Sequence, residues 1–331
     1  MICSISYPGG KRKENQDVVK HYVSDDQNII ILSIFDGHGP RYGRLVADIA
    51  ATTVISHLVQ QSDIKTNTEC RILEAFDKAH DSIREELLRQ GSDRIADSDG
   101  VVFEKNNIIM GGTTATVAVI INKHDLFVAN VGDSDSILLN KEDFKVLTSS
   151  HSPENVEEKE RIDATDGKKP LFLYSGSATK PPKQIYNSSG EVTKLGNYTK
   201  NVRNELASIV SVEYMHKVYF LAMTRALGDF YFHTHGVSSK PSINKYTIED
   251  EILMLCTDGV WDNWKYEDIQ TMIASKTLNE QKDVDAIGNE FFNETLYRGL
   301  QNFGNKRDDM SFIIFKFQTN HTQRRPLVRR P

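Results

Sequence analysis

The chain has few cysteines, no long hydrophobic run and no excess of positive charge. Its three cysteines, Cys3, Cys70 and Cys256, are widely spaced among 331 residues. An odd number of distant cysteines favours neither a disulfide framework nor a zinc site and is typical of a reducing compartment. We therefore expect an intracellular protein of the cytoplasm or the nucleus.

Several other classes of protein are also disfavoured. No apolar stretch approaches the roughly 20 residues that a membrane-spanning helix needs, and the N-terminus lacks a signal-peptide pattern. The formal net charge of −6 gives no reason to expect nucleic-acid binding. With 39% hydrophobic and 26% charged residues, the composition is that of an ordinary globular protein.

Residues 29–51 predict a buried strand, a tight turn and a helix, in that order. Residues 29–35 are almost all apolar and rich in β-branched side chains, which favours a strand buried on both faces. The run ends at Asp36-Gly37-His38-Gly39-Pro40, a turn signal, and apolar residues then recur at helical spacing. An acid and an imidazole thus lie on a loop between rigid elements. Because Asp-Gly pairs are also ordinary turn chemistry, a plain turn and a functional loop are equally open here.

Carboxylates recur at the ends of other predicted strands. Residues 111–139 predict short strands with tight turns, which favours an antiparallel arrangement. The apolar strand 252–256 ends in Thr257-Asp258-Gly259 and leads into a helix, as residues 29–51 do. The acids at such positions are Asp17, Asp36, Asp133, Asp258 and the Asp308–Asp309 pair. Taken alone, Asp17 fits a solvated loop better, and Asp133 fits a plain hairpin turn equally well.

These acids could converge, because in antiparallel neighbours the end of one strand lies beside the start of the next. Several carboxylates within a few ångströms cannot all ionise without a compensating cation. Oxygen ligands without paired cysteines or histidines select Mg²⁺ or Mn²⁺ over zinc. Two such ions sharing a carboxylate form a clamp suited to in-line attack on phosphorus. Arg12 and His38 are placed in the sequence to bind phosphate oxygens and to protonate a leaving group.

The order of the motifs resembles the metal-dependent serine/threonine protein phosphatases of the PP2C family. The likeness extends from Arg12 to Phe315, and each motif alone is weak, but so many in one order are not expected by chance. The matching segments are Arg12 with Asn15-Gln16-Asp17, Phe35-Asp36-Gly37-His38-Gly39, Gly112-Thr113-Thr114-Ala115, Ala129-Asn130-Val131-Gly132-Asp133-Ser134, Glu158–Ile162, Leu221–Asp229, Thr257-Asp258-Gly259-Val260-Trp261-Asp262 and Arg307-Asp308-Asp309-Met310.

The resemblance implies an α+β fold, a four-layer αββα sandwich with two central antiparallel β-sheets flanked by helices. A single phosphatase domain would span residues 1–318, with an enlarged insert at about 166–217. Residues 319–331 would form a basic C-terminal tail. A monomer acting on a phosphoprotein substrate is implied as well.

The resemblance also implies a site for two Mg²⁺ or Mn²⁺ ions. Asp36 would bridge the ions, and the carbonyl oxygen of Gly37 would be an added ligand. Asp258 and Asp308 would complete the protein ligands. Asp133, together with Asp258, matches the position that some relatives use for a third, weaker ion.

The remaining implied roles concern the phosphate and the water around the ions. A metal-activated water would attack phosphorus while Arg12 holds the phosphoryl oxygens. His38 would protonate the departing serine or threonine oxygen, and Asp17 would order nearby water. The expected activity is therefore hydrolysis of phosphoserine and phosphothreonine in proteins.

The sequence departs from the family pattern at several places, and Gln16 and Asp309 are the departures that support a catalytically silent module. Gln16 stands where a glutamate is common, Asp309 replaces the usual asparagine, and the long insert lacks an Arg-Val-x-Gly pattern. A catalytically silent binding or regulatory module is one alternative to the enzyme. A metal phosphoesterase acting on small molecules is another, since the same site could perform that reaction. The insert leads us to expect unusual substrate choice.

Overall fold

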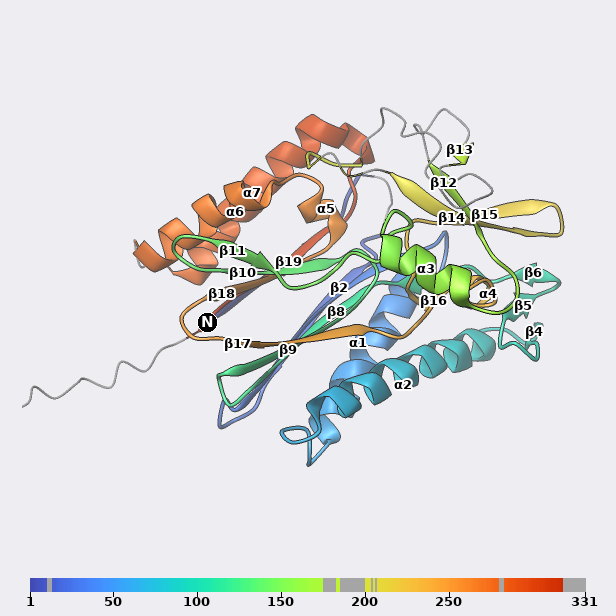
Figure 1. Cartoon of the computed structure of the whole chain (residues 1–331), viewed down its shortest axis with the longest axis horizontal. Coiled ribbons are helices and arrows are strands. Elements are labelled where there is room, and N and C mark those ends of the chain that lie inside the picture. The colour runs from blue at the N-terminus through green and yellow to red at the C-terminus, as the bar shows by residue number, and fades with distance from the viewer. Residues whose placement is uncertain are drawn as a thin grey trace, which may run out of the picture.

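The computed structural model describes residues 1–10, 14–174, 183–184, 200–203, 205, 207–279 and 283–317. Arg12 and the predicted tail, residues 319–331, lie outside these described residues. Two large antiparallel sheets form the centre of the molecule, and helices cover their outer faces (Figure 1). The predicted α+β fold, a four-layer αββα sandwich, is confirmed.

The first sheet is organised around β3 (Ile29–His38), the strand predicted at residues 29–35. One edge of β3 pairs with β2 (Asp17–Val23), and the other edge pairs with β7 and β8. The other strands of this sheet are β7 (Gly112–Thr113), β8 (Ala115–Ile121), β9 (Asp125–Val131), β16 (Leu227–Gly228) and β17 (Ser242–Thr247). All pairings are antiparallel, as the short strands and tight turns of residues 111–139 predict.

The second sheet has the strand order β1-β19-β18-β10-β11. Chain segments from both ends of the described sequence therefore pair at one edge of it. Its strands are β1 (Ile2–Tyr7), β10 (Asp135–Leu139), β11 (Phe144–Val146), β18 (Ile252–Cys256) and β19 (Met310–Lys316).

Helices form the two outer layers. In Figure 1, α1 and α2 lie on one side of the sandwich, and α5, α6 and α7 lie on the other. Their bounds are α1 (Gly43–Gln60), α2 (Thr68–Arg89), α5 (Asp258–Trp261), α6 (Tyr266–Ile269), a π-helical segment (Gln270–Asn279), α7 (Val284–Phe303) and a short 3-10 turn (Gly304–Lys306). Among the described residues, no helix has the length and apolar character needed to cross a membrane.

The layered packing explains why β3 is apolar almost throughout. Ile31 and Phe35 pack in the core between the first sheet and α1 and α2. Leu32 and Ile34 alternate with them and point into the core between the sheets, where they join Ile313 of β19. Within β3, the buried Ser33 hydroxyl donates to the carbonyl oxygen of Lys20. A strand buried on both faces favours apolar side chains until it emerges at its end. That end is where Asp36 lies.

Two segments outside the central sheets also contain strands. The polar and acidic composition of residues 90–107 is typical of a loop, but they hold β4 (Arg94–Ala96), β5 (Val102–Glu104) and the start of β6 (Asn107–Ile108). The Arg94 guanidinium anchors this small sheet, since it donates hydrogen bonds to Tyr42 Oη, to the carbonyl oxygen of Leu87 and to Glu104. Tyr42 lies 52 positions from Arg94, and a partner that distant gives no local signal in a polar stretch.

The predicted insert at about 166–217 also contributes to a sheet, in the order β13-β12-β14-β15. The bounds in this region are α3 (Val156–Ala164), β12 (Leu171–Tyr174), β13 (Lys183–Gln184), β14 (Ser208–Tyr214), β15 (Lys217–Leu221) and α4 (Phe230–His233). Phe172, Val210 and Val212 share a small core with Ile162 and Phe232. This sheet lies beside one end of the central sandwich (Figure 1).

Candidate functional site

Asp17 and Asp36 lie opposite each other at one end of the first sheet. The antiparallel register of β2 and β3 pairs Asp17 directly with Asp36. The Asp36 N–H donates to Thr114 Oγ1 at 3.0 Å, which fixes the backbone at the end of β3. Asp17 is buried, with 1% of its surface exposed, so the solvated loop that its neighbours suggested is wrong. The cause is tertiary, because the second sheet covers it.

The second sheet brings its own acids to the same end. Strands β18 and β19 are antiparallel neighbours, so Asp258, just after β18, lies near Asp308, just before β19. The Thr257 hydroxyl donates to Asp17 Oδ2 at 3.0 Å and thereby joins the two sheets. The register that pairs Asp135 with Cys256 places the preceding turn beside the start of α5. Asp133 lies in that turn.

These acids influence one another electrostatically. Burial and the charges of Asp17, Asp258, Asp308 and Asp133 raise the pKa of Asp36 well above its usual value. Burial is also the main cause that raises the pKa of Asp17 to about 8, with Asp309 and Asp258 adding to it. A group of carboxyls with raised pKa values must hold protons or attract a cation. The structure thus brings together the five aspartates predicted from the sequence.

The backbone around Gly37 leaves no room for a side chain. A β-carbon there would lie 2.4 Å from the carbonyl oxygen of Gly43 and 2.6 Å from that of Gln16. The Gly37 N–H donates to this Gln16 carbonyl at 3.3 Å. Glycine is therefore required where β3 passes under the start of α1, and its backbone stays beside the acids.

The two substituted positions have structural roles. Gln16 donates through its amide to the carbonyl oxygen of Gly39 at 3.3 Å. The Asp309 carboxylate accepts the N–H groups of Gly9 at 2.7 Å and Gln16 at 2.8 Å. The Asp309 side chain therefore connects the N-terminal segment to the start of β19.

His38 is held by an aspartate that sequence analysis did not choose. His38 Nε2 lies 2.5 Å from Oδ2 of Asp229, whose side chain is fully buried. A β-carbon on Gly112 would come within 2.0 Å of the same Asp229 oxygen and 2.7 Å of His38 Nε2. Glycine at this position therefore makes room for the pair. The sequence feature that could have indicated Asp229 is its position at the end of the Leu221–Asp229 motif.

Lys200 is the second residue that sequence analysis missed. Its Nζ lies 2.7 Å from Asp133 Oδ2 and 3.2 Å from Asp258 Oδ2. In the part of the chain that the structure describes, no three His, Cys, Asp or Glu side chains are arranged to hold a metal ion between them. The fit to Mg²⁺ or Mn²⁺ therefore rests on the all-oxygen donor set and on the unfavourable burial of several acids together.

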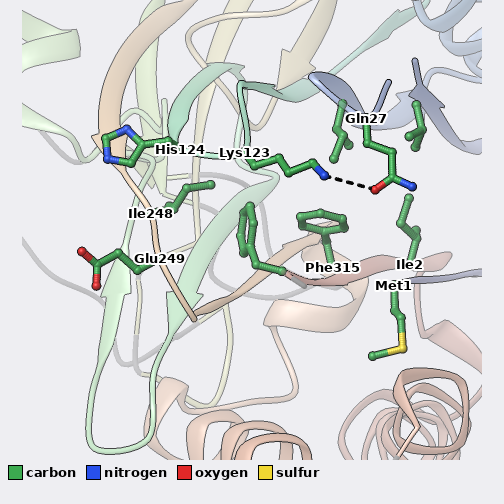
Figure 2. A pocket seen from close by; sticks show the side chains of 11 residues that line it. Met1, Ile2, Gln27, Lys123, His124, Ile248, Glu249 and Phe315 are labelled. Atoms are coloured by element: carbon green, nitrogen blue, oxygen red, sulfur yellow. Dashed lines mark hydrogen bonds between the residues drawn. The ribbon is translucent and has the colours of Figure 1, made fainter. Parts of the chain in front are cut away.

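A separate cavity lies at the opposite end of the same strands. It measures about 560 Å³, and β3 contributes Ile30 to it while β19 contributes Phe315. Figure 2 shows Ile2, Ile248 and Phe315 around it, with Lys123 reaching across to Gln27. None of the clustered aspartates lines this cavity. The clustered aspartates and this cavity thus lie at opposite ends of the same strands.

The acid cluster predicts how stability depends on pH in the absence of metal. The pKa of Asp17 rises from 3.8 to about 8 on folding, so near pH 7 the folded chain binds more protons than the unfolded chain. The free energy of unfolding should then fall as pH rises from 7 to 8. We expect a lower melting temperature by circular dichroism at pH 8 than at pH 7 in a chelator, and a smaller fall with excess Mn²⁺.

The interval from pH 7 to 8 and the variant Asp17→Asn separate the contribution of Asp17 from that of the buried histidines. Buried His80, His151 and His233 have lowered pKa values, chiefly from burial, so their neutral forms favour folding as pH rises through their unfolded pKa of 6.5. That opposite trend is largely complete by pH 7. Asp17→Asn should reduce the fall between pH 7 and 8, and a wild-type melting temperature that rises over this interval contradicts the prediction.

Comparisons with known proteins agree with the fold and the order of motifs. The family model described as Protein phosphatase 2C matches residues 9–303. Probable protein phosphatase 2C 52 of Oryza sativa subsp. japonica is 25% identical over 322 residues, which is 96% of this chain and 51% of that protein. Protein phosphatase 1A of Homo sapiens is 24% identical over 296 residues, or 86% of this chain and 62% of that protein. The chain thus spans only part of the length of these relatives.

Solved structures resemble the whole fold. A serine-threonine phosphatase 2C from Toxoplasma gondii superposes with a TM-score of 0.66 at 15% identity, covering 96% of this chain and 94% of the other. A C. elegans sex determining protein gives 0.65 at 18% identity, with 96% and 65% covered. The layered sandwich is therefore a fold that these solved structures share. The chain belongs to the protein phosphatase 2C family.

Proposed function

We propose that this chain hydrolyses phosphoserine and phosphothreonine in proteins, at a site that takes up two Mg²⁺ or Mn²⁺ ions. One observation supports this most. Asp17, Asp133, Asp258 and Asp308 lie close enough to Asp36 to raise its pKa, although they come from four separate parts of the chain. So much negative charge at one end of a fold is costly unless cations bind there.

The family resemblance assigns the ligands of that site. Asp36 would bridge the ions, Gly37 would offer its carbonyl oxygen, and Asp258 and Asp308 would complete the protein ligands, with Asp17 ordering nearby water. Asp133 is the further candidate, for a third ion. When bound, the ions supply Lewis acidity that makes water nucleophilic at neutral pH and offsets the charge of a phosphoryl group.

The chain's own residues then position and protonate the substrate. His38, oriented by Asp229, would give its proton to the departing serine or threonine oxygen. Arg12 lies outside the described residues, and its proposed role in holding the phosphoryl oxygens comes from the sequence. Gly112 keeps space for the His38–Asp229 pair.

A metal titration tests the proposed function. We expect the purified chain to release phosphate from a phosphothreonine peptide only when Mn²⁺ or Mg²⁺ is added, and to lose this activity in excess chelator. Binding of Mn²⁺ without hydrolysis of any phosphopeptide would favour the silent binding module instead. Faster turnover of nucleotides than of phosphopeptides would favour the small-molecule phosphoesterase. Monomeric state and an intracellular location remain predictions from the sequence.

A further inference from the structure

Lys200 places a positive charge inside the acid cluster. Its ammonium group bridges Asp133 Oδ2 at 2.7 Å and Asp258 Oδ2 at 3.2 Å. The Asp133 side chain is 6% exposed, that of Asp258 is 22% exposed and that of Lys200 is 26% exposed. The pair of acids that the family resemblance marks for a third ion therefore already has a cation between its carboxylates.

The residues after Lys200 fix it on α5. The Asn201 amide donates to Asp262 Oδ1 at 3.1 Å, and the Val202 N–H donates to the Asp262 carbonyl oxygen at 3.3 Å. The Lys200 N–H donates to the carbonyl oxygen of Glu205 at 2.6 Å, which closes a tight loop. Lys200 is therefore a positioned side chain, unlike a lysine that explores solvent.

Arg203 strengthens the same attachment. Its guanidinium donates to the carbonyl oxygens of Trp261 and Trp264, forms an ion pair with Glu205 at 2.8 Å and lies 4.9 Å from the centre of the Tyr266 ring. An arginine that satisfies several backbone carbonyls at once holds two segments in a defined geometry. The loop that carries Lys200 is thus held against α5, whose first residue is Asp258.

Lys200 is surrounded by acids. Its ammonium group contacts Asp133 and Asp258, and the next residue, Asn201, is hydrogen-bonded to Asp262. A divalent ion between Asp133 and Asp258 would need the space that the ammonium group occupies, and the positive charge of Lys200 would repel it. The two cations are therefore mutually exclusive.

We propose that Lys200 is a built-in cation that takes the place of a third metal ion between Asp133 and Asp258. Because this rests on the proposed function, the chain would bind two divalent ions where an otherwise equal chain with a neutral residue 200 would bind three. Lys200 acts here as a positioning residue. Its charge offsets the two carboxylates whether or not metal is present. The site would then lack a third, weaker ion through which metal concentration could regulate activity.

Counting bound Mn²⁺ tests this proposal without measuring activity. Free Mn²⁺ is quantified by electron paramagnetic resonance while wild type, Lys200→Met and Lys200→Gln are titrated. We expect each variant to bind one more ion per chain than wild type. Any binding of a third ion to wild type should be weaker than in the variants by about ten-fold or more, the effect of one neighbouring charge on an ionic equilibrium. Adding Asp133→Asn to Lys200→Met should remove the extra ion.

Matched controls separate the possible outcomes. Lys245→Met removes an exposed lysine paired with Asp125 at 3.7 Å and should leave the count unchanged. Equal counts and affinities in wild type and both Lys200 variants overturn the proposal for Lys200, whereas a wild type that binds no Mn²⁺ overturns the binuclear site itself. If the Lys200 variants do not fold, the number of Mn²⁺ ions bound by the single variant Asp133→Asn tests the proposal. This variant should keep the wild-type count, and a lost ion would show that Asp133 serves metal.

Discussion

Replacing Asp36 by asparagine is expected to lower Mn²⁺-dependent hydrolysis of a phosphothreonine peptide by about 10²–10³-fold or more. Losses of this size follow removal of a single preorganised electrostatic group. Asparagine fits the same volume but cannot offer an anionic oxygen to two ions. Initial rates at saturating Mn²⁺ measure the effect. Asp81→Asn, which removes an exposed acid paired with Arg84 on α2, is the matched control and should keep full activity.

The same variant should be more stable than wild type when no metal is present. Burial and four neighbouring acids raise the pKa of Asp36, so its ionised form destabilises the folded chain. In a chelator at pH 8, Asp36→Asn should therefore melt at a higher temperature than wild type. This opposite response of activity and stability distinguishes a functional acid from a structural one. An inactive variant that melts earlier would indicate misfolding, and full activity would exclude Asp36 from the metal site.

His38→Gln is expected to slow hydrolysis of the phosphothreonine peptide by about 10²–10⁴-fold, the usual contribution of a general acid. The loss should be much smaller with p-nitrophenyl phosphate, because p-nitrophenolate is a stable leaving group that needs no proton. The ratio of the two losses measures the proton transfer itself. A merely structural histidine would affect both substrates equally, and that result would contradict the assignment.

Asp229 supplies the second arm of this experiment. Its carboxylate lies 2.5 Å from His38 Nε2, so Asp229→Asn should shift the pH dependence of kcat while preserving part of the rate. His124→Gln is the control, since His124 is exposed at the opposite end of the sandwich, beside the cavity in Figure 2. An unchanged pH profile in Asp229→Asn would show that the contact does not orient the acid.

The central strands and the family were predictable because their signals are local. Residues 29–35 are apolar on both sides of β3, since one side packs against α1 and α2 and the other against the second sheet. The strand ends where this double burial ends, so the acid that follows marks the end of the sandwich. The repeated pattern at Asp258 has the same cause in β18.

Segments stabilised by distant contacts were not predictable in this way. The Arg94 guanidinium in the small sheet at residues 94–108 donates to Tyr42, which lies 52 positions away in sequence. The strands of the 166–217 region share a core with Ile162 and Phe232. A polar or aperiodic stretch gives no sign of such partners before the chain is folded.

The sequence by itself determined which acids stand at strand ends, because burial of a strand dictates where its polar residues begin. Only the tertiary structure decided what each acid meets there. It buries Asp17 opposite Asp36 on the neighbouring strand and places His38 in contact with Asp229. It also places Lys200 between Asp133 and Asp258. These pairings depend on register and on the packing of one sheet over another. Such long-range geometry decides whether a carboxylate is solvated, protonated or paired with a cation.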